Sequence, residues 1–210
     1  MKKELLFKIL PHIVAPFLFL LAAYVYFSPL IEGKGLSQHD VVQWKGQVKE
    51  IQDYRAATGE ETLWTNTMFG GMPSYLISVQ FRTNMLKLAD RIIQLGARPA
   101  SYIFATLIGF YILLLVLGVS PWLSIVGAFA YGLSSYFFII IGAGHNAKIH
   151  AICYVAPMIA GMILTFRGKL FGGFALFALF FGLNLYTGHP QITYYAGFVM
   201  IALTIVYLTE

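Results

Sequence analysis

The chain has 210 residues, of which 59% are hydrophobic and 11% are charged, and its mean hydropathy is +0.74. Soluble domains carry roughly 25% charged residues, so this composition excludes an ordinary water-soluble globule. The net charge of +5 does not indicate a nucleic-acid partner, because the basic residues are scattered along the chain. The single cysteine, Cys153, excludes a disulfide within the chain.

The first apolar segment predicts a membrane span over about residues 9–31. A span needs roughly 20 mostly apolar residues to cross about 30 Å of hydrocarbon. This segment follows the basic residues Lys2 and Lys3, and bulky residues stand where a signal peptide would have a small-residue cleavage site. We therefore expect a retained anchor helix with its N-terminus in the cytoplasm.

The polar stretch of residues 32–100 predicts a large loop outside the membrane. Apolar residues at helical spacing from Val41 to Tyr54 predict an amphipathic helix that ends near Gly59. The aromatic, nearly uncharged segment 63–73 is typical of an ordered loop. A second amphipathic helix has an apolar stripe from Phe81 to Leu95, which either lies in the outer head-group layer or packs on other helices of the protein.

Five further apolar runs follow, at about residues 101–118, 121–142, 150–166, 170–186 and 191–208. They predict an all-α integral membrane protein with about six transmembrane helices in one transmembrane domain, residues 1–210. Several runs are short for a simple span, which favours tilted or partly inserted helices. Arg167 and Lys169 separate the fourth and fifth runs and fall on the cytoplasmic side of this topology. We expect the chain to be the N-terminal part of a longer protein.

The titratable residues of chemical interest fall mainly on the predicted outer face. Asp40 is the candidate for a catalytic base or a metal ligand. The alternative is a capping role, because Ser37 and Asp40 match the Ser-x-x-acid pattern of a helix start. Asp53 is a second acid in the same loop and an alternative to Asp40.

A glycine turn precedes the polar residues His145, Asn146, Lys148 and His150. A glycine turn that leads into a helix start, with a lysine and two imidazoles, suits an anionic group such as a phosphate. The alternative is that Lys148 only anchors the helix end among lipid phosphates.

Two further polar residues lie near the last two runs. His189 occupies the turn before the sixth run, where it is either functional or simply solvated. Asn184 lies near the outer end of the fifth run, where it either bridges helices or lines a cavity.

An anchor helix, an acid-bearing outer loop and the segment Leu63-Trp-Thr-Asn-Thr-Met-Phe-Gly-Gly-Met-Pro73 together resemble the YfhO-like bacterial membrane proteins, which belong with the GT-C-fold glycosyltransferases. The Gly-His turn after the third run and the Gly-His-Pro-Gln turn after the fifth are compatible with this family. Residues 37–39 depart from it, because the family's acid often follows glycines.

The resemblance implies a GT-C-like fold in the bacterial cytoplasmic membrane and a sugar transfer at its outer face. The donor would be a polyprenyl-phosphate-linked sugar and the acceptor an envelope glycan or lipid, with Asp40 as the base or as a ligand of a divalent metal. The cofactor is otherwise left open. The candidate substrate-binding residues are His39, Trp64, Asn66, His145, Asn146, Lys148, His150, His189 and Gln191.

Two other functional classes use the same surface without bond formation. A transporter, flippase or lipid-binding protein would need polar groups through the depth of the membrane, and the middles of the predicted spans hold few. A structural partner in envelope assembly would use the outer loop as a docking surface.

Overall fold

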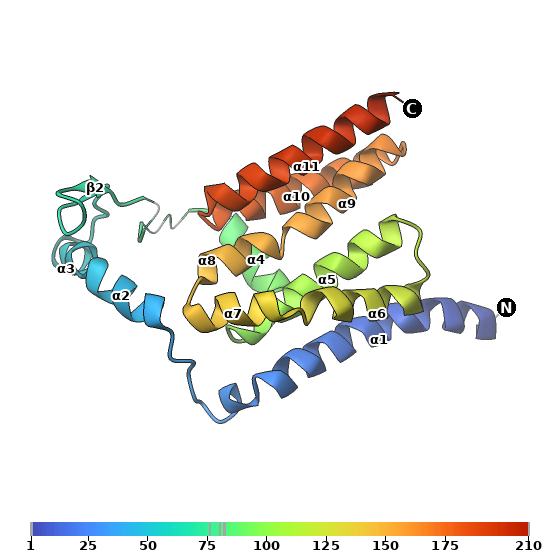
Figure 1. Ribbon diagram of the computed structural model, residues 1–210, viewed down its shortest axis with the longest axis horizontal. Helices are drawn as coiled ribbons and strands as arrows, with labels where there is room; N and C mark the ends of the chain where they lie inside the picture. Colours follow the sequence, from blue (N-terminus) through green and yellow to red (C-terminus); the bar gives the residue numbers. More distant parts are fainter. Residues whose placement is uncertain (1, 76, 80, 82, 210) are drawn as a thin grey trace.

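A bundle of apolar helices carries a small polar lobe at one end (Figure 1). The computed structural model describes residues 2–75, 77–79, 81 and 83–209. The bundle helices are α1 (Lys2–Tyr26), α5 (Ala100–Val116), α6 (Pro121–Gly132), α7 (Ser135–Ala143), α8 (Asn146–Ile152), α9 (Val155–Phe166), α10 (Leu170–Tyr186) and α11 (Pro190–Thr209). Between α1 and α5 lie η1 (Ser28–Leu30), α2 (His39–Gln47), α3 (Lys49–Thr58), β1 (Trp64–Thr65), β2 (Met72–Pro73) and α4 (Leu86–Ile93).

Three helical segments in the described part of the chain are long and apolar enough to cross a membrane: Leu6–Tyr26, Asn146–Phe166 and Pro190–Thr209. A fourth is added if α6 and α7, which are bent by 44° at their junction, form one span. Helices α5 and α10 have 17 residues each, about 26 Å at the α-helical rise and so short of the hydrocarbon thickness. The chain is therefore mostly helical with segments that can cross a membrane, and the count of six spans stays a prediction.

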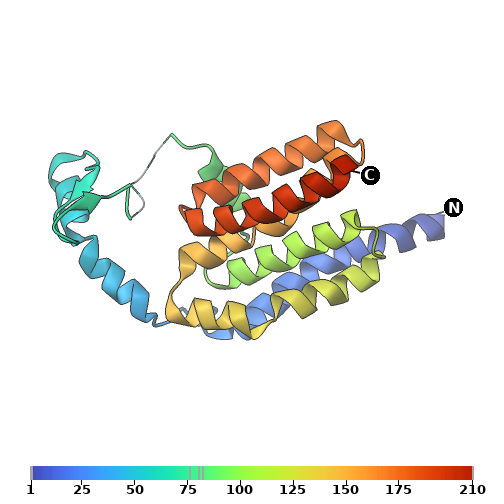
Figure 2. The same ribbon diagram turned by 45° about the horizontal axis from the view of Figure 1, so that its top comes forward.

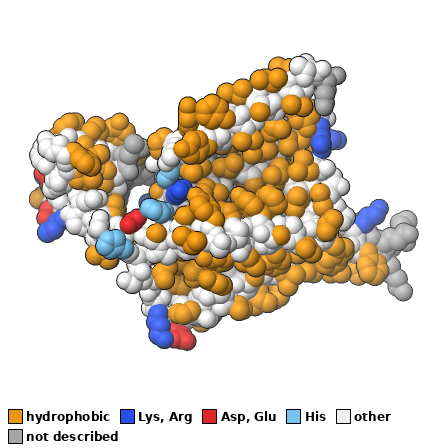
Figure 3. Space-filling model, viewed as in Figure 1, with side chains coloured by type: hydrophobic (Ala, Val, Ile, Leu, Met, Phe, Trp, Pro, Cys, Tyr) orange, Lys and Arg blue, Asp and Glu red, His pale blue; other side chains and the backbone are white. Residues whose placement is uncertain are grey.

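The outside of the bundle is apolar, as a lipid-facing surface requires. On α1, Ala15 and Phe19 are fully buried against α5 and α6, whereas Phe17 and Leu21 on the opposite side are exposed. Hydrophobic side chains cover most of the visible bundle surface in Figure 3. A monomeric soluble protein rarely exposes so large a continuous apolar surface, so the exterior supports the membrane assignment made from composition.

The two ends of the bundle differ in what they carry. Figures 1 and 2 show the N-terminus and the α9–α10 connection at one end and the polar lobe at the other. Arg167 and Lys169 lie in that connection. The structure thus places these basic residues at the end of the bundle opposite the lobe, as the predicted alternation requires.

Glycine allows helices α9 and α10 to pack with their backbones close together. A Cβ atom on Gly161 would lie 2.4 Å from the backbone nitrogen of Phe177 and 2.9 Å from the carbonyl oxygen of Gly173. Small residues at such crossings are typical of membrane helices, where association depends on close packing more than on the hydrophobic effect.

Asn184 bridges three helices near the lobe end of the bundle. Its amide Nδ2 donates to the carbonyl oxygen of Ala151 on α8 at 2.9 Å, and Thr193 Oγ1 on α11 donates to its Oδ1 at 2.6 Å. The side chain is fully buried, so both bonds satisfy groups that water does not reach. Of the two interpretations that the sequence left open, helix bridging is the one observed, and it fixes the α10–α11 turn that carries His189.

The polar lobe differs from its prediction in one respect. The single amphipathic helix expected up to Gly59 is two helices, α2 and α3, which meet at the buried Val48. A short antiparallel pairing of Trp64–Thr65 with Met72–Pro73 follows. Glu50 on α3 holds this hairpin, because its carboxylate accepts hydrogen bonds from Thr65 Oγ1 at 2.6 Å and the Asn66 backbone N–H at 2.9 Å.

Helix α4 packs on the bundle through the side opposite the predicted apolar stripe. Leu86, Ala89 and Ile93 pack against the buried cluster around Tyr154 and Phe180, and Asp90 and Gln94 are buried beside them. The helix therefore packs on other helices of the same chain, one of the two predicted environments, while Met85 and Leu88 of the stripe stay 86% and 62% exposed.

Candidate functional site

Asp40 lies beside His145 where the lobe meets the bundle. Asp40 Oδ2 lies 3.1 Å from His145 Nδ1, and both side chains are about half exposed. The cap residue of α2 is Gln38, and no side chain makes a capping hydrogen bond at that helix start. No hydrogen bond therefore supports the alternative role of Asp40 as a helix cap. Its carboxylate points instead toward the α7–α8 turn.

Close approach of this turn to α2 depends on Gly144 and on a pair of amides. Gly144 has φ +103°, and a Cβ atom there would lie 3.1 Å from Asp40 Cβ. Asn146 Nδ2 donates to Gln38 Oε1 at 3.0 Å, and Gln38 Nε2 donates back to Asn146 Oδ1 at 3.2 Å and to the Ile141 carbonyl oxygen. The lobe is thus tied to the bundle beside the Asp40–His145 pair.

These residues line a cavity of about 510 Å³, called here the Asp40 cavity. Figure 3 shows acidic, basic and histidine side chains gathered at the junction of lobe and bundle. The lining comes from α2, the α7–α8 turn, the start of α8, the α10–α11 turn and the segment before α5. It consists of Asp40, Val41, Trp44, Arg98, Gly144, His145, Asn146, Ala147, Lys148 and His189.

His189 has an unusual environment in this cavity. Its Nδ1 atom is buried and has no hydrogen-bond partner in the described part of the chain. Burial, together with the positive charges of Lys148 and His145, lowers the pKa of His189 below 6.5. The imidazole is therefore neutral at pH 7.

No protein-family model, curated protein or solved structure matches this chain.

A second polar cluster, of which His150 alone was among the predicted site residues, lies on the bundle side of α4. The carboxylate of Asp90 is buried, with His150 Nε2 and Tyr154 Oη each 2.5 Å from its Oδ1. Arg98 lies 3.8 Å from its Oδ2. Burial disfavours the charged form, but hydrogen bonds from His150 and Tyr154 outweigh it and lower the pKa of Asp90. Asp90 is therefore ionised at neutral pH.

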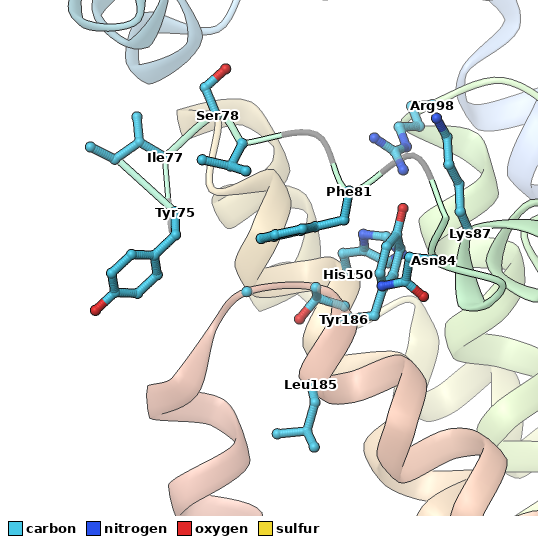
Figure 4. Close-up of a pocket in the computed structure, with 13 residues that line it drawn as sticks. Tyr75, Ile77, Ser78, Phe81, Asn84, Lys87, Arg98, His150, Leu185 and Tyr186 are labelled. Carbon is cyan, nitrogen blue, oxygen red and sulfur yellow. The ribbon is translucent and has the colours of Figure 1, made fainter. Parts of the chain in front are cut away.

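His150 and Arg98 open onto a cavity of about 610 Å³, called here the His150 cavity (Figure 4). Arg98 lines both cavities. The wall of the His150 cavity is completed by Tyr75, Ile77, Ser78, Val79, Phe81, Asn84, Lys87, Leu185, Tyr186, Thr187 and Gly188. The structure thus separates His150 from His145, Asn146, Lys148 and His189, with which the sequence grouped it.

The remaining predicted residues line neither cavity. His39 Nε2 lies 2.8 Å from Gln43 Nε2 on the same helix, and Gln191 donates to the hydroxyl of Tyr195 at 2.9 Å. Trp64 and Asn66 belong to the hairpin that Glu50 holds. The contacts described for these four residues are within the lobe or within one helix, and none of them brings a predicted residue to Asp40.

A metal site is not built by these side chains alone. Within the residues that the structure describes, no group of three or more His, Cys, Asp or Glu side chains is placed to hold a metal ion. Asp40 has only His145 beside it as a ligand of these types.

Asp90 and Arg98 are the functional candidates that the sequence reasoning missed. Asp90 and Gln94 are one helical turn apart on the side of α4 opposite its apolar stripe. In a helix beside a membrane, polar residues opposite an apolar stripe can face the protein. The spacing of Asp90 and Gln94 was therefore the sequence signal that could have identified Asp90 as a buried group. Arg98, directly before Pro99 and α5, had no distinguishing pattern.

Proposed function

We propose that this chain is the N-terminal part of a membrane glycosyltransferase of the GT-C type, related to the YfhO-like proteins, and that the Asp40 cavity holds its reacting groups. The observation that carries the proposal is the convergence of a carboxylate, Asp40, and a lysine, Lys148, in one cavity at the lobe end of the bundle. These residues come from segments more than a hundred positions apart in the sequence.

In the proposed reaction, an acceptor hydroxyl attacks the anomeric carbon of a sugar linked to a polyprenyl phosphate. The bond between that carbon and the phosphate oxygen breaks, and the lipid phosphate leaves. Asp40 takes the hydroxyl proton as general base. Lys148 offsets the negative charge that develops on the leaving phosphate, and His189 lies in the wall of the same cavity.

The neighbours of these two residues support their roles. His145 lies beside the Asp40 carboxylate and fixes its position. Lys148 Nζ lies 5.5 Å from the ring centre of Tyr136, which holds the ammonium group near an aromatic face. We further propose six spans, with α5, α10 and the bent α6–α7 pair among them, an N-terminus in the cytoplasm and the Asp40 cavity at the outer face of a bacterial cytoplasmic membrane.

The test is sugar transfer from a polyprenyl-phosphate donor by the full-length protein in membranes, at matched protein levels. We expect Asp40→Asn to reduce transfer by about 10²–10⁴-fold, the usual contribution of a general base. Asp53→Asn is the matched control, because Asp53 is exposed on α3, pairs with Lys49 at 2.8 Å and lines neither cavity. Its transfer should equal that of the wild type.

Two outcomes would contradict the proposal. Transfer that survives Asp40→Asn would remove Asp40 from the chemistry. Absence of transfer from the wild type across varied donors would favour the transporter, flippase or lipid-binding alternative, for which the same charged cavity would bind a ligand without changing it.

A further inference from the structure

The His150 cavity has the composition of an anion site. Lys87 and Arg98 bring two positive charges to its wall, and none of the described residues that line it is acidic. Figure 4 shows the Lys87 and Arg98 side chains at the same side of the cavity, above Asn84 and His150. The Asp40 cavity, by contrast, contains a carboxylate.

Buried side chains hold the cationic wall in place from behind. Asp90 lies beneath the wall and is bonded to His150 and Tyr154, and Gln94 Nε2 donates to the Tyr154 hydroxyl at 3.3 Å. His150 and Asp90 side chains are each 8% exposed. A buried carboxylate is costly unless it is paired, and here it is bonded to His150 and lies 3.8 Å from the exposed guanidinium of Arg98. The wall of the cavity is therefore backed by a buried, paired group.

The rest of the wall is suited to a ligand with an apolar part. Leu185 and Phe81 both line the cavity and are 53% and 59% exposed. Leu185 lies at the end of α10, whose apolar length faces outward over much of its surface. A ligand held by its charged group at Lys87 and Arg98 therefore has room to place an apolar chain toward the bundle surface.

From these observations we propose that the His150 cavity binds a phosphate ester, with Lys87 and Arg98 as its charged contacts. A phosphate group accepts several charge-assisted hydrogen bonds at once, which matches two cationic side chains at one side of the cavity. The site is separate from the Asp40 cavity and shares only Arg98 with it. It does not depend on the proposed sugar transfer.

The test is photo-cross-linking of the purified full-length protein in a maltoside detergent, which contains no phosphate. The probe is a diazirine derivative of farnesyl phosphate, and the cross-linked peptides are located by mass spectrometry. We expect cross-links at the described lining residues 75, 77–79, 81, 84 and 185–188. Unmodified farnesyl phosphate should compete with the probe, and farnesol, which has the same chain without phosphate, should not.

Two lysine variants make the measurement specific. Lys87→Gln should raise the probe concentration needed for half-maximal cross-linking at these lining residues by about tenfold, the loss expected for one charged hydrogen bond. Lys45→Gln removes an exposed lysine of α2 that lines neither cavity and should change nothing. Lys87 is exposed, so its variant is expected to keep the wild-type unfolding temperature.

Competition by inorganic phosphate separates the two sources of the ligand. Competition at the same concentrations as farnesyl phosphate would assign the site to a free phosphate compound, and competition by farnesyl phosphate alone would assign it to a lipid head group. The proposal fails if cross-links occur only around residues 40–48 and 144–148, if farnesol competes equally, or if Lys87→Gln behaves as Lys45→Gln does.

Discussion

Replacement of Gly144 by alanine should loosen the junction between lobe and bundle. The residue has φ +103° and ψ 12°, where an L-amino acid costs about 1–2 kcal/mol. The new Cβ atom would also lie 3.1 Å from Asp40 Cβ, 3.2 Å from Gln38 Cβ and 3.3 Å from the Val41 nitrogen. Overpacking of this kind costs about 1–3 kcal/mol, less if α2 moves away. We expect a net loss of about 2 kcal/mol, or roughly 4–8 °C in unfolding temperature for a chain of this size.

The assay is thermal unfolding in detergent micelles, with Gly142→Ala as the matched control. Gly142 lies two positions earlier, inside α7, and no atom lies within 4 Å of the Cβ that alanine would add. Alanine is favoured over glycine in a helix by roughly 1 kcal/mol, so the control should be as stable as the wild type or slightly more so. Equal unfolding temperatures for Gly144→Ala and Gly142→Ala would refute the docked arrangement of α2 on the α7–α8 turn.

Two further predictions concern helix packing and ionisation. Gly161→Leu should separate α9 from α10 and lower the free energy of unfolding by about 3 kcal/mol or more. Gly172→Leu, with open space around its Cβ, should be tolerated. Chemical unfolding in mixed micelles compares the two variants, and equal losses of stability would contradict the close packing of α9 and α10. The NMR titration of His189 should have its midpoint below pH 6.5, since burial and nearby positive charge both oppose protonation. Lys148→Gln should raise that midpoint only in part, because burial is the larger cause, and a wild-type midpoint at or above 6.5 would contradict this environment.

Hydrophobic runs predicted the helices of the bundle well, because a long apolar run has few other ways to satisfy its backbone in a membrane. The breaks inside the runs were not predicted. Helix α7 starts after Ser134, and α8 and α9 meet around Cys153 and Tyr154. Gly132 ends α6 at the first break, whereas no proline or glycine lies between Ala151 and Tyr154 at the second. Such breaks depend on how each half packs against its neighbours, which periodicity does not report.

The Asp40 cavity was partly predictable, and the His150 cavity was not. Counting spans places Asp40, His145, Lys148 and His189 on one side of the membrane, and the structure gathers these four around one space. Which histidine accompanies which acid depends instead on how helix α4 packs on the bundle. Its inward side brings Asp90 to His150, and sequence spacing carries no information about that pairing.

The two cavities differ in the charges on their walls. The Asp40 cavity combines a carboxylate with a lysine, and the His150 cavity presents cations without a carboxylate on its wall. A carboxylate beside a phosphate repels it, so an anion held for its charge alone is better placed where the nearest acid is buried and paired, as Asp90 is. Arg98 lines both cavities and also lies 3.8 Å from Asp90, so replacing this residue would change the charge on both walls at once.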